Sequence, residues 1–126
     1  MTIHQPPGQP LKTIDALVER GLVAPARREA LAEVAKRYAV SVTPAVAALI
    51  DPADTADPIA RQFVPDAAEL RTLPEELADP IGDEAHSPVE GVVHRYPDRA
   101  LLKLVHACPV YCRFCFRREM VGPGKE

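Results

Sequence analysis

Three cysteines, Cys108, Cys112 and Cys115, are the residues of this 126-residue chain that most clearly indicate chemistry. They are its only cysteines, and their spacing is Cys-x3-Cys-x2-Cys. Thiolates favour zinc and iron–sulfur clusters among the common biological metals. A structural zinc ion would need a further protein ligand, which His94 or His106 would have to supply. A 4Fe-4S cluster held by only three cysteines instead leaves an iron open to a small molecule, an arrangement that favours catalysis.

Length and composition are those of one ordinary globular domain. Hydrophobic residues make up 47% of the chain and charged residues 26%. No apolar run approaches the roughly 20 residues that cross a bilayer. The first ten residues, MTIHQPPGQP, lack the basic start and apolar stretch of a secretory signal. We therefore expect a cytoplasmic location and no membrane partner. Thiols stay reduced there, so we interpret the cysteines as metal ligands and not as a disulfide framework.

The net charge of −3 is unevenly distributed. Residues 1–50 carry a charge of +2, residues 51–90 carry −9, and residues 91–126 carry +4. The acidic middle is expected to be a solvated surface. The basic end coincides with the cysteines, and its field suits anionic ligands such as phosphates and carboxylates. No nucleic-acid partner is expected, because no recognised reader motif accompanies the positive charge.

Residues 1–50 are predicted to form a helical head. Thr13 is a typical helix N-cap, and Gly21 is a typical stop after apolar residues at helical spacing. A second helix is predicted over 25–38 because proline suits its first turn and apolar residues recur at helical spacing. A threonine–proline pair opens a third helix, which is predicted over 44–50.

Residues 51–90 form a proline-rich acidic segment. Helical turns are predicted at 59–63 and 74–77, joined by irregular connections. The segment has little apolar material of its own to bury, so we expect it to wrap over something larger.

Two strands are predicted next, over 89–96 and 100–107. The second, ALLKLVHA, is almost continuously apolar, as in a strand buried on both faces of a parallel sheet. The cysteines would then lie at the carboxyl end of that strand, where α/β barrels place their chemistry. The predicted fold class is α/β, with the N-terminal helical segment leading into the first strand or strands of a truncated (β/α) barrel within 91–126.

The cysteine spacing, with the aromatic Phe114 just before the third cysteine, resembles the signature of radical S-adenosylmethionine enzymes. A narrower resemblance, to the lysine 2,3-aminomutase family, is carried by DPIARQFVP at 57–65 and DPIGDEAHSPVEGVVHRYPDRALLKLVHACPVYCRFCFRR at 79–118. The resemblance is close over 57–122 and looser over the head. It implies that the three cysteines hold a 4Fe-4S cluster and that the open iron binds S-adenosylmethionine. Cleavage of that molecule would yield a 5′-deoxyadenosyl radical.

The resemblance also implies pyridoxal 5′-phosphate as a second cofactor and assigns residues to it. Arg95 and Tyr96 match positions that approach this cofactor, and Arg99 lies in the same motif and is expected to help with the phosphate. Arg117 matches the arginine that pairs with the substrate carboxylate, and Phe114 is a candidate neighbour of the adenine. Guanidinium groups suit these tasks because they bind phosphate and carboxylate bidentately. The alternatives are that these arginines lie on an ordinary surface and that the two aromatic rings only pack.

Other arginines and lysines are expected to have no role in the site. Arg113, which precedes Phe114, and Arg118, which follows Arg117, are interpreted as solvated. The lysines at 12, 36, 103 and 125 match nothing catalytic. The lysine that holds pyridoxal phosphate in the family lies far downstream of the matched region. The chain is therefore expected to be an incomplete N-terminal part of a longer enzyme and to be inactive alone.

The predicted activity is migration of the α-amino group of L-lysine, or of a lysine-like amino acid, to the β carbon. A flavodoxin or ferredoxin is the expected electron donor, and a homo-oligomer is possible. One alternative is an enzyme acting on a lysyl group destined for elongation factor P. Another is a radical S-adenosylmethionine reaction without pyridoxal phosphate. The non-enzyme alternative is a small zinc-binding interaction module.

Overall fold

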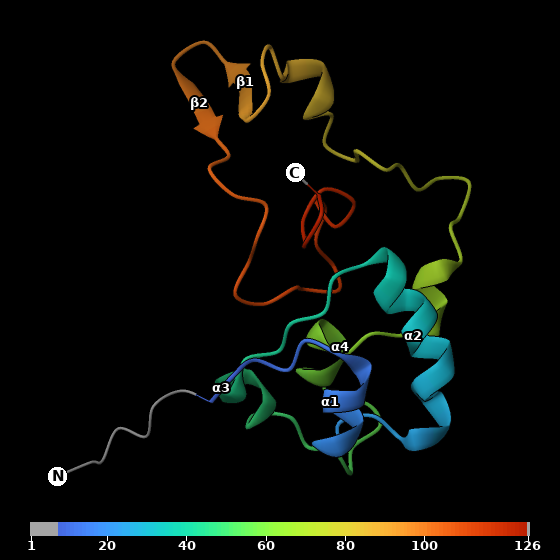
Figure 1. Cartoon of the computed structure of the whole chain (residues 1–126). Coiled ribbons are helices and arrows are strands. Elements are labelled where there is room, and N and C mark those ends of the chain that lie inside the picture. The colour runs from blue at the N-terminus through green and yellow to red at the C-terminus, as the bar shows by residue number, and fades with distance from the viewer. Residues whose placement is uncertain (1–7, 126) are drawn as a thin grey trace, which may run out of the picture.

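The computed structural model describes residues 8–125, which form a mixed α/β chain (Figure 1). The α-helices are α1 (Ile14–Glu19), α2 (Arg28–Arg37), α3 (Pro44–Ala47) and α4 (Ala60–Phe63). The 3-10 helices are η1 (Pro25–Arg27), η2 (Ala67–Leu70) and η3 (Glu84–His86), and the strands are β1 (Val92–Tyr96) and β2 (Arg99–Leu102). No helix in this described part is long and apolar enough to cross a membrane.

The local helix signals in the head are confirmed. The Thr13 side chain accepts a hydrogen bond from the third backbone N–H of α1 at 3.1 Å, and Gly21 adopts a φ of 78° just after the helix. A residue with a side chain is strained at such a positive φ, so glycine suits this stop. The predicted second helix is present as η1 followed by α2. The third helix is shorter than predicted, because α3 ends at Ala47.

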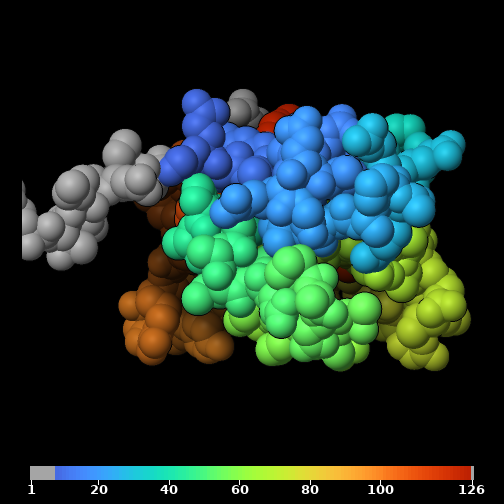
Figure 2. All heavy atoms as spheres, turned by 90° about the horizontal axis from the view of Figure 1, so that it is seen from below, coloured from blue at the N-terminus to red at the C-terminus, as the bar shows by residue number. Residues whose placement is uncertain are grey.

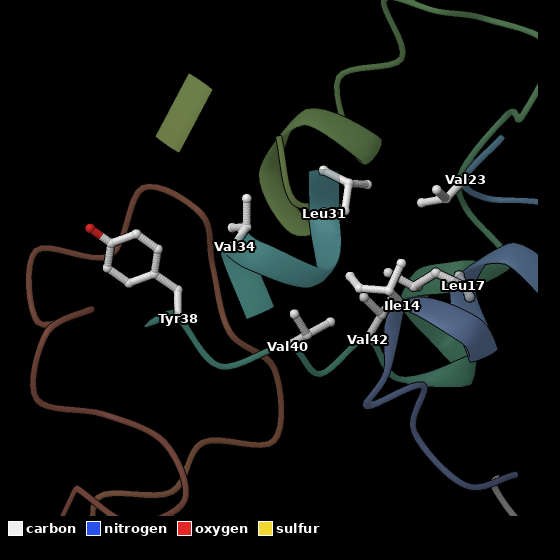
Figure 3. Packing of buried hydrophobic residues seen from close by; sticks show 9 residues of the cluster. Ile14, Leu17, Val23, Leu31, Val34, Tyr38, Val40 and Val42 are labelled. Atoms are coloured by element: carbon white, nitrogen blue, oxygen red, sulfur yellow. The ribbon is translucent and has the colours of Figure 1, made fainter. Parts of the chain in front are cut away.

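The hydrophobic core lies where α1 and α2 pack together (Figure 3). Leu17, Leu31, Val34 and Val42 are fully buried there. Burying a side chain of this size contributes about 1.5–3 kcal/mol. Apolar residues of α4 and its C-cap pack against the same cluster, so the core of the head extends beyond residue 50.

The acidic segment follows the predicted pattern in part. The predicted helical turn at 59–63 is confirmed by α4, whereas 74–77 contains a simple turn at 74–75 and no helix. η2 begins with a capping box. The Asp66 side chain accepts a hydrogen bond from the backbone N–H of Ala68, and the Glu69 side chain accepts one from the backbone N–H of Asp66. η2 also packs on α2.

The prediction of a buried parallel strand over 100–107 is wrong. β1 and β2 form an antiparallel hairpin, and β2 ends at Leu102 with all four of its residues exposed. The short turn at residues 97–98 brings the chain straight back, which imposes antiparallel pairing. No other strand pairs with the hairpin within residues 8–125, so Leu104 and Val105 stay 82% and 71% exposed. The described residues therefore form no barrel.

The hairpin and η3 lie at the end of the molecule away from α1 and α3, and the chain after β2 runs back to the head (Figure 1). Seen from below, the head and the segment that follows it form one continuous surface (Figure 2). The return of the chain after β2 brings the cysteines against the head.

Candidate cofactor and substrate site

The cysteines lie on a closed loop without regular secondary structure, residues 106–122, which we call the cysteine loop. The backbone N–H of Gly122 donates to the carbonyl of His106 at 2.8 Å and closes the loop. Inside it, the N–H of Cys115 donates to the carbonyl of Cys112, and the N–H of Arg118 donates to that of Cys115, each at 3.2 Å. Successive turns thus replace the strand end on which the cysteines were expected to lie.

Backbone hydrogen bonds attach the cysteine loop to the head. The N–H of Tyr111 donates to the carbonyl of Ser41 at 3.2 Å, and the hydroxyl of Ser41 donates to the carbonyl of Pro109 at 2.9 Å. The N–H of Arg113 donates to the carbonyl of Gln62 at 2.7 Å. The loop is therefore held in place by α4 and by the connection between α2 and α3.

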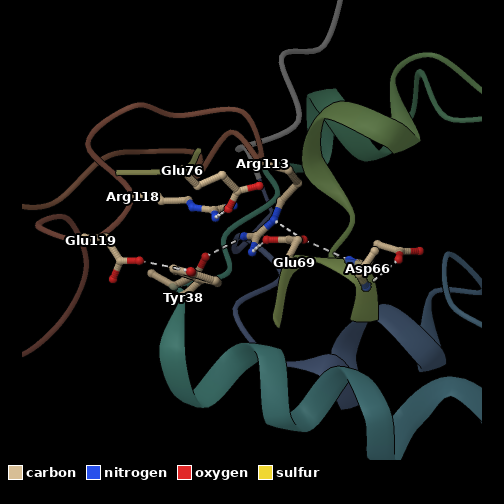
Figure 4. A network of polar contacts seen from close by, with 9 residues as sticks. Tyr38, Asp66, Glu69, Glu76, Arg113, Arg118 and Glu119 are labelled. Carbon is tan, nitrogen blue, oxygen red and sulfur yellow. Dashed lines mark hydrogen bonds and ion pairs between the residues drawn. The ribbon is translucent and has the colours of Figure 1, made fainter. Parts of the chain in front are cut away.

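A buried ion pair joins the cysteine loop to η2 (Figure 4). The Nε and Nη2 atoms of Arg113 lie 3.0 and 2.6 Å from the two carboxylate oxygens of Glu69. Its Nη1 donates to the carbonyl of Ala39 at 2.8 Å. The two side chains are only 8% and 11% exposed, so the expectation of a solvated Arg113 is wrong. The Asp-x-x-Glu capping pattern at 66–69 was the available sequence signal for an ordered acidic partner.

A second polar cluster holds the end of the loop against α2. Glu119 accepts hydrogen bonds from the hydroxyl of Tyr38 at 3.0 Å and from Arg37 at 2.9 Å. The Arg118 guanidinium lies 4.5 Å from the centre of the Tyr38 ring, so this arginine is also packed and not simply solvated. Burial and the hydrogen bond to Glu119 raise the pKa of Tyr38. Burial opposes ionisation of Glu119, but the bonds from Tyr38 and Arg37 outweigh it and lower the pKa of this carboxyl.

The three cysteines are free thiols that are not gathered into one group. Cys108 is exposed, and Cys112 and Cys115 are half-buried. Cys108 lines a hollow of about 380 Å³, whereas Cys115 lines another of about 300 Å³. Within residues 8–125, no set of three or more histidine, cysteine or acidic side chains is arranged to hold a metal ion. The donor set itself, three accessible thiols on one loop, fits a thiolate-bound cluster.

Two predicted anion-binding residues, Arg95 and Arg117, are brought together by an acidic residue that the sequence reasoning missed. The Nε of Arg117 donates to one carboxylate oxygen of Asp83 at 2.9 Å. The Nη2 of Arg95 lies 3.6 Å from the other oxygen and also donates to the carbonyl of Ile81. The Asp83 side chain is 4% exposed, whereas the arginines are partly exposed at 32% and 28%. Nothing local to Asp83 in the sequence marks this role.

The arginines of the cysteine loop differ in how much hydrogen-bonding capacity they have left. Arg113 uses all three of its nitrogens on Glu69 and Ala39. Arg117 uses only Nε, and its guanidinium lies 4.7 Å from the centre of the Phe116 ring. Among the described residues, no acceptor contacts its Nη1 and Nη2 atoms. Arg117 therefore presents the terminal edge of its guanidinium, a geometry that suits a carboxylate.

The remaining predicted site residues lie apart from this meeting point. Arg99 pairs with its neighbour Asp98 at 2.8 Å, and its guanidinium lies 5.5 Å from the centre of the Tyr96 ring. Neither residue makes a hydrogen bond or ion pair to the cysteine loop within the described chain. Phe114 is 68% exposed, so it is not a core residue of the described chain, and Tyr96 is also exposed.

Comparison with known proteins gives relatives that are much longer than this chain. No protein-family model matches it. It is 38% identical to the L-lysine 2,3-aminomutase of Clostridium subterminale over 116 residues, which are 92% of the chain and 28% of that protein. It is 34% identical to the glutamate 2,3-aminomutase of Clostridioides difficile over 109 residues, 86% of the chain and 26% of the relative.

A third relative, the L-lysine 2,3-aminomutase of Bacillus subtilis, is 39% identical over 87 residues, 69% of the chain and 18% of that protein. The chain thus spans about a quarter of the length of the L-lysine 2,3-aminomutases that it matches over most of its own length. The longest of these matches covers 92% of the chain. Over most of its own length, the chain is therefore similar to members of the lysine 2,3-aminomutase family.

Proposed function

We propose that this chain carries the cluster-binding loop and part of the substrate site of a radical S-adenosylmethionine, pyridoxal phosphate-dependent 2,3-aminomutase. The reaction is migration of the α-amino group of L-lysine, or of a similar amino acid, to the β carbon. The observation that carries the proposal is the meeting of Arg95 and Arg117 at Asp83, on the same chain as a loop of three free thiols. The names of the relatives support the same reaction.

Cys108, Cys112 and Cys115 would hold a 4Fe-4S cluster and leave one iron for the amine and carboxylate of S-adenosylmethionine. When bound, the cluster with S-adenosylmethionine supplies hydrogen abstraction by a carbon radical, and pyridoxal phosphate supplies a covalent anchor for the migrating amine. The loop's own task is to present the thiols from a fixed support, which its bonds to the head provide. The exposure of Cys108 suits electron delivery by a flavodoxin or ferredoxin.

Arg117 would bind the α-carboxylate of the substrate through its terminal nitrogens. A bidentate guanidinium–carboxylate contact fixes the direction of the amino acid as well as its position. Arg95 would neutralise the phosphate of pyridoxal phosphate, with Tyr96 and Arg99 as further contacts and Phe114 beside the adenine. Recognition through the α-carboxylate favours a free amino acid over a lysyl group within a protein, because a peptide bond removes that charge.

Anaerobic reconstitution with iron and sulfide tests the cluster. We expect a brown, oxygen-sensitive chain with about four iron atoms, and replacement of any one of the three cysteines by alanine should remove most of the iron. A colourless chain that holds one zinc ion and no iron would overturn the proposal in favour of a zinc-binding module.

The reaction itself is tested on the longest polypeptide that the gene encodes, loaded with both cofactors. We expect formation of a β-amino acid from L-lysine and less from L-glutamate. Cleavage of S-adenosylmethionine without any binding of pyridoxal phosphate would instead indicate a different radical reaction.

A further inference from the structure

Asp83 occupies an unusual place for an acidic residue. It is buried between two arginines for which we propose anionic ligands, the α-carboxylate of the substrate and a phosphate. A carboxylate there lowers the local positive charge and, by charge alone, weakens the binding of both anions. It must contribute something other than charge if the site is to bind them well.

The backbone holds Asp83 in one position. Its N–H donates to one carboxylate oxygen of Asp79 at 2.9 Å, and the N–H of Glu84 donates to the other at 2.8 Å. These bonds, with that of Glu84 the stronger, lower the pKa of Asp79. The hydroxyl of Ser87 donates to the carbonyl of Asp83 at 2.8 Å. The backbone of Asp83 is thus fixed by hydrogen bonds to Asp79, which precedes η3, and to Ser87, which follows it.

Each oxygen of Asp83 orients one arginine. The oxygen that contacts Arg117 binds the Nε side of the guanidinium, while the ring of Phe116 covers one face. Only the terminal edge of this guanidinium is left for a ligand. Arginine has a long side chain that loses conformational entropy when it binds a ligand. Because the contact at Nε already restricts the side chain of Arg117, much of this entropy is lost before the ligand binds.

We propose that Asp83 is a positioning residue, which holds Arg117 and Arg95 in the orientation that receives the substrate carboxylate and the phosphate. This inference rests on the proposed function and deepens it. Because two arginines share one carboxylate, the group keeps a net positive charge and still attracts an anion. An alternative is that Asp83 only mimics an anion and competes with it. The two readings predict opposite signs when the carboxylate is neutralised.

The first test observes the orientation directly in the 126-residue chain by NMR of arginine side chains. We expect the Nε–H signal of Arg117 to be shifted downfield and to exchange slowly with water, unlike that of the exposed Arg99. In the Asp83→Asn variant this signal should lose its shift and exchange faster. The matched control is Asp15→Asn, which removes the same charge from an exposed pair with Arg28 and should leave the signal unchanged. Fast exchange of Arg117 in the unmodified chain would overturn the proposal without any variant.

The second test titrates the same chain with acetate, a probe for the substrate carboxylate, and follows the Arg117 signal. We expect Asp83→Asn to bind acetate about threefold to tenfold more weakly, the range that corresponds to freeing one long side chain. Tighter binding by the variant would overturn the positioning role, because removal of charge alone strengthens anion binding. Iron content after reconstitution should be equal in both forms. If neither the unmodified chain nor the Asp83→Asn variant binds iron, the proposed cluster is refuted. The role of Asp83 is then decided by the NMR measurements alone.

Discussion

Replacement of Arg113 by alanine should destabilise the chain more than any other change in the cysteine loop. Arg113 and Glu69 are each about nine-tenths buried, and their contact is bidentate at 2.6 and 3.0 Å. Removal of one partner from a buried ion pair leaves the other charge without compensation, which typically costs about 3–5 kcal/mol. The same change also leaves the carbonyl of Ala39 without its donor. We therefore expect a loss of about 4 kcal/mol in the free energy of unfolding.

The assay is unfolding in urea followed by far-ultraviolet circular dichroism, because the chain has no tryptophan for a fluorescence signal. With a slope of about 1.5–2 kcal/mol per molar urea, a loss of about 4 kcal/mol lowers the midpoint by about 2–3 M. Glu33→Gln is the matched control, because its pair with Lys36 is exposed on the surface of α2. This control should change the stability by less than about 0.5 kcal/mol.

A double-variant cycle separates the pair from the other contacts of each partner. Glu69→Gln keeps the shape of the side chain and can still accept the capping hydrogen bond from the N–H of Asp66. Combined with Arg113→Gln, it should cost clearly less than the sum of the two single changes, because no buried charge is left alone. The reasoning would be refuted if Arg113→Ala lowered the free energy of unfolding no more than Glu33→Gln does, and if the effects of the two single changes in the cycle were strictly additive.

Three further predictions concern how the head and the loop are held. Thr13→Ala removes the N-cap of α1 and should cost about 1 kcal/mol in urea unfolding, whereas Thr13→Ser should cost little. Gly122→Ala places a Cβ 2.7 Å from that of Ala39 at a φ of 123°, so we expect a loss of about 1–3 kcal/mol and faster amide exchange in the cysteine loop. The pKa of Glu119 is lower in the folded chain than its ordinary value of 4.5, so the ionised carboxylate stabilises the fold above pH 4.5. This contribution should disappear as the pH falls through the pKa of Glu119 in the folded chain. A Tyr38→Phe variant, which lacks one of the hydrogen bonds to this carboxylate, should show a smaller acid dependence of the free energy of unfolding in urea titrations at several pH values.

The contacts of Arg113 and Asp83 with the rest of the chain could not be predicted from the sequence. Arg113 reaches Glu69 across 44 residues, and Arg117 reaches Asp83 across 34. Local patterns predict helix caps and turns because the interacting groups lie within a few positions of each other. A contact between distant residues depends on how the intervening chain folds back, and the residue types alone do not specify that path.

The apolar run at 100–107 illustrates the same limit. Its composition is that of a buried strand, but burial requires neighbouring strands, and residues 8–125 provide only β1 as a partner. The turn at 97–98 then determined an antiparallel hairpin with an exposed second strand.

By itself, the sequence determined the caps and bounds of the first helices, the three-thiol donor set and the resemblance to an aminomutase family. These follow from residue types at short spacing, where backbone geometry leaves few choices. Only the tertiary structure decided how many hydrogen bonds each arginine of the cysteine loop makes to the rest of the described chain. Arg113 is fully occupied by Glu69, whereas Arg117, four residues later, is held by Asp83 at one edge and left open at the other. Packing of distant segments distributes the hydrogen-bond acceptors, and that distribution separates an arginine whose nitrogens are all paired from one that pairs only through Nε.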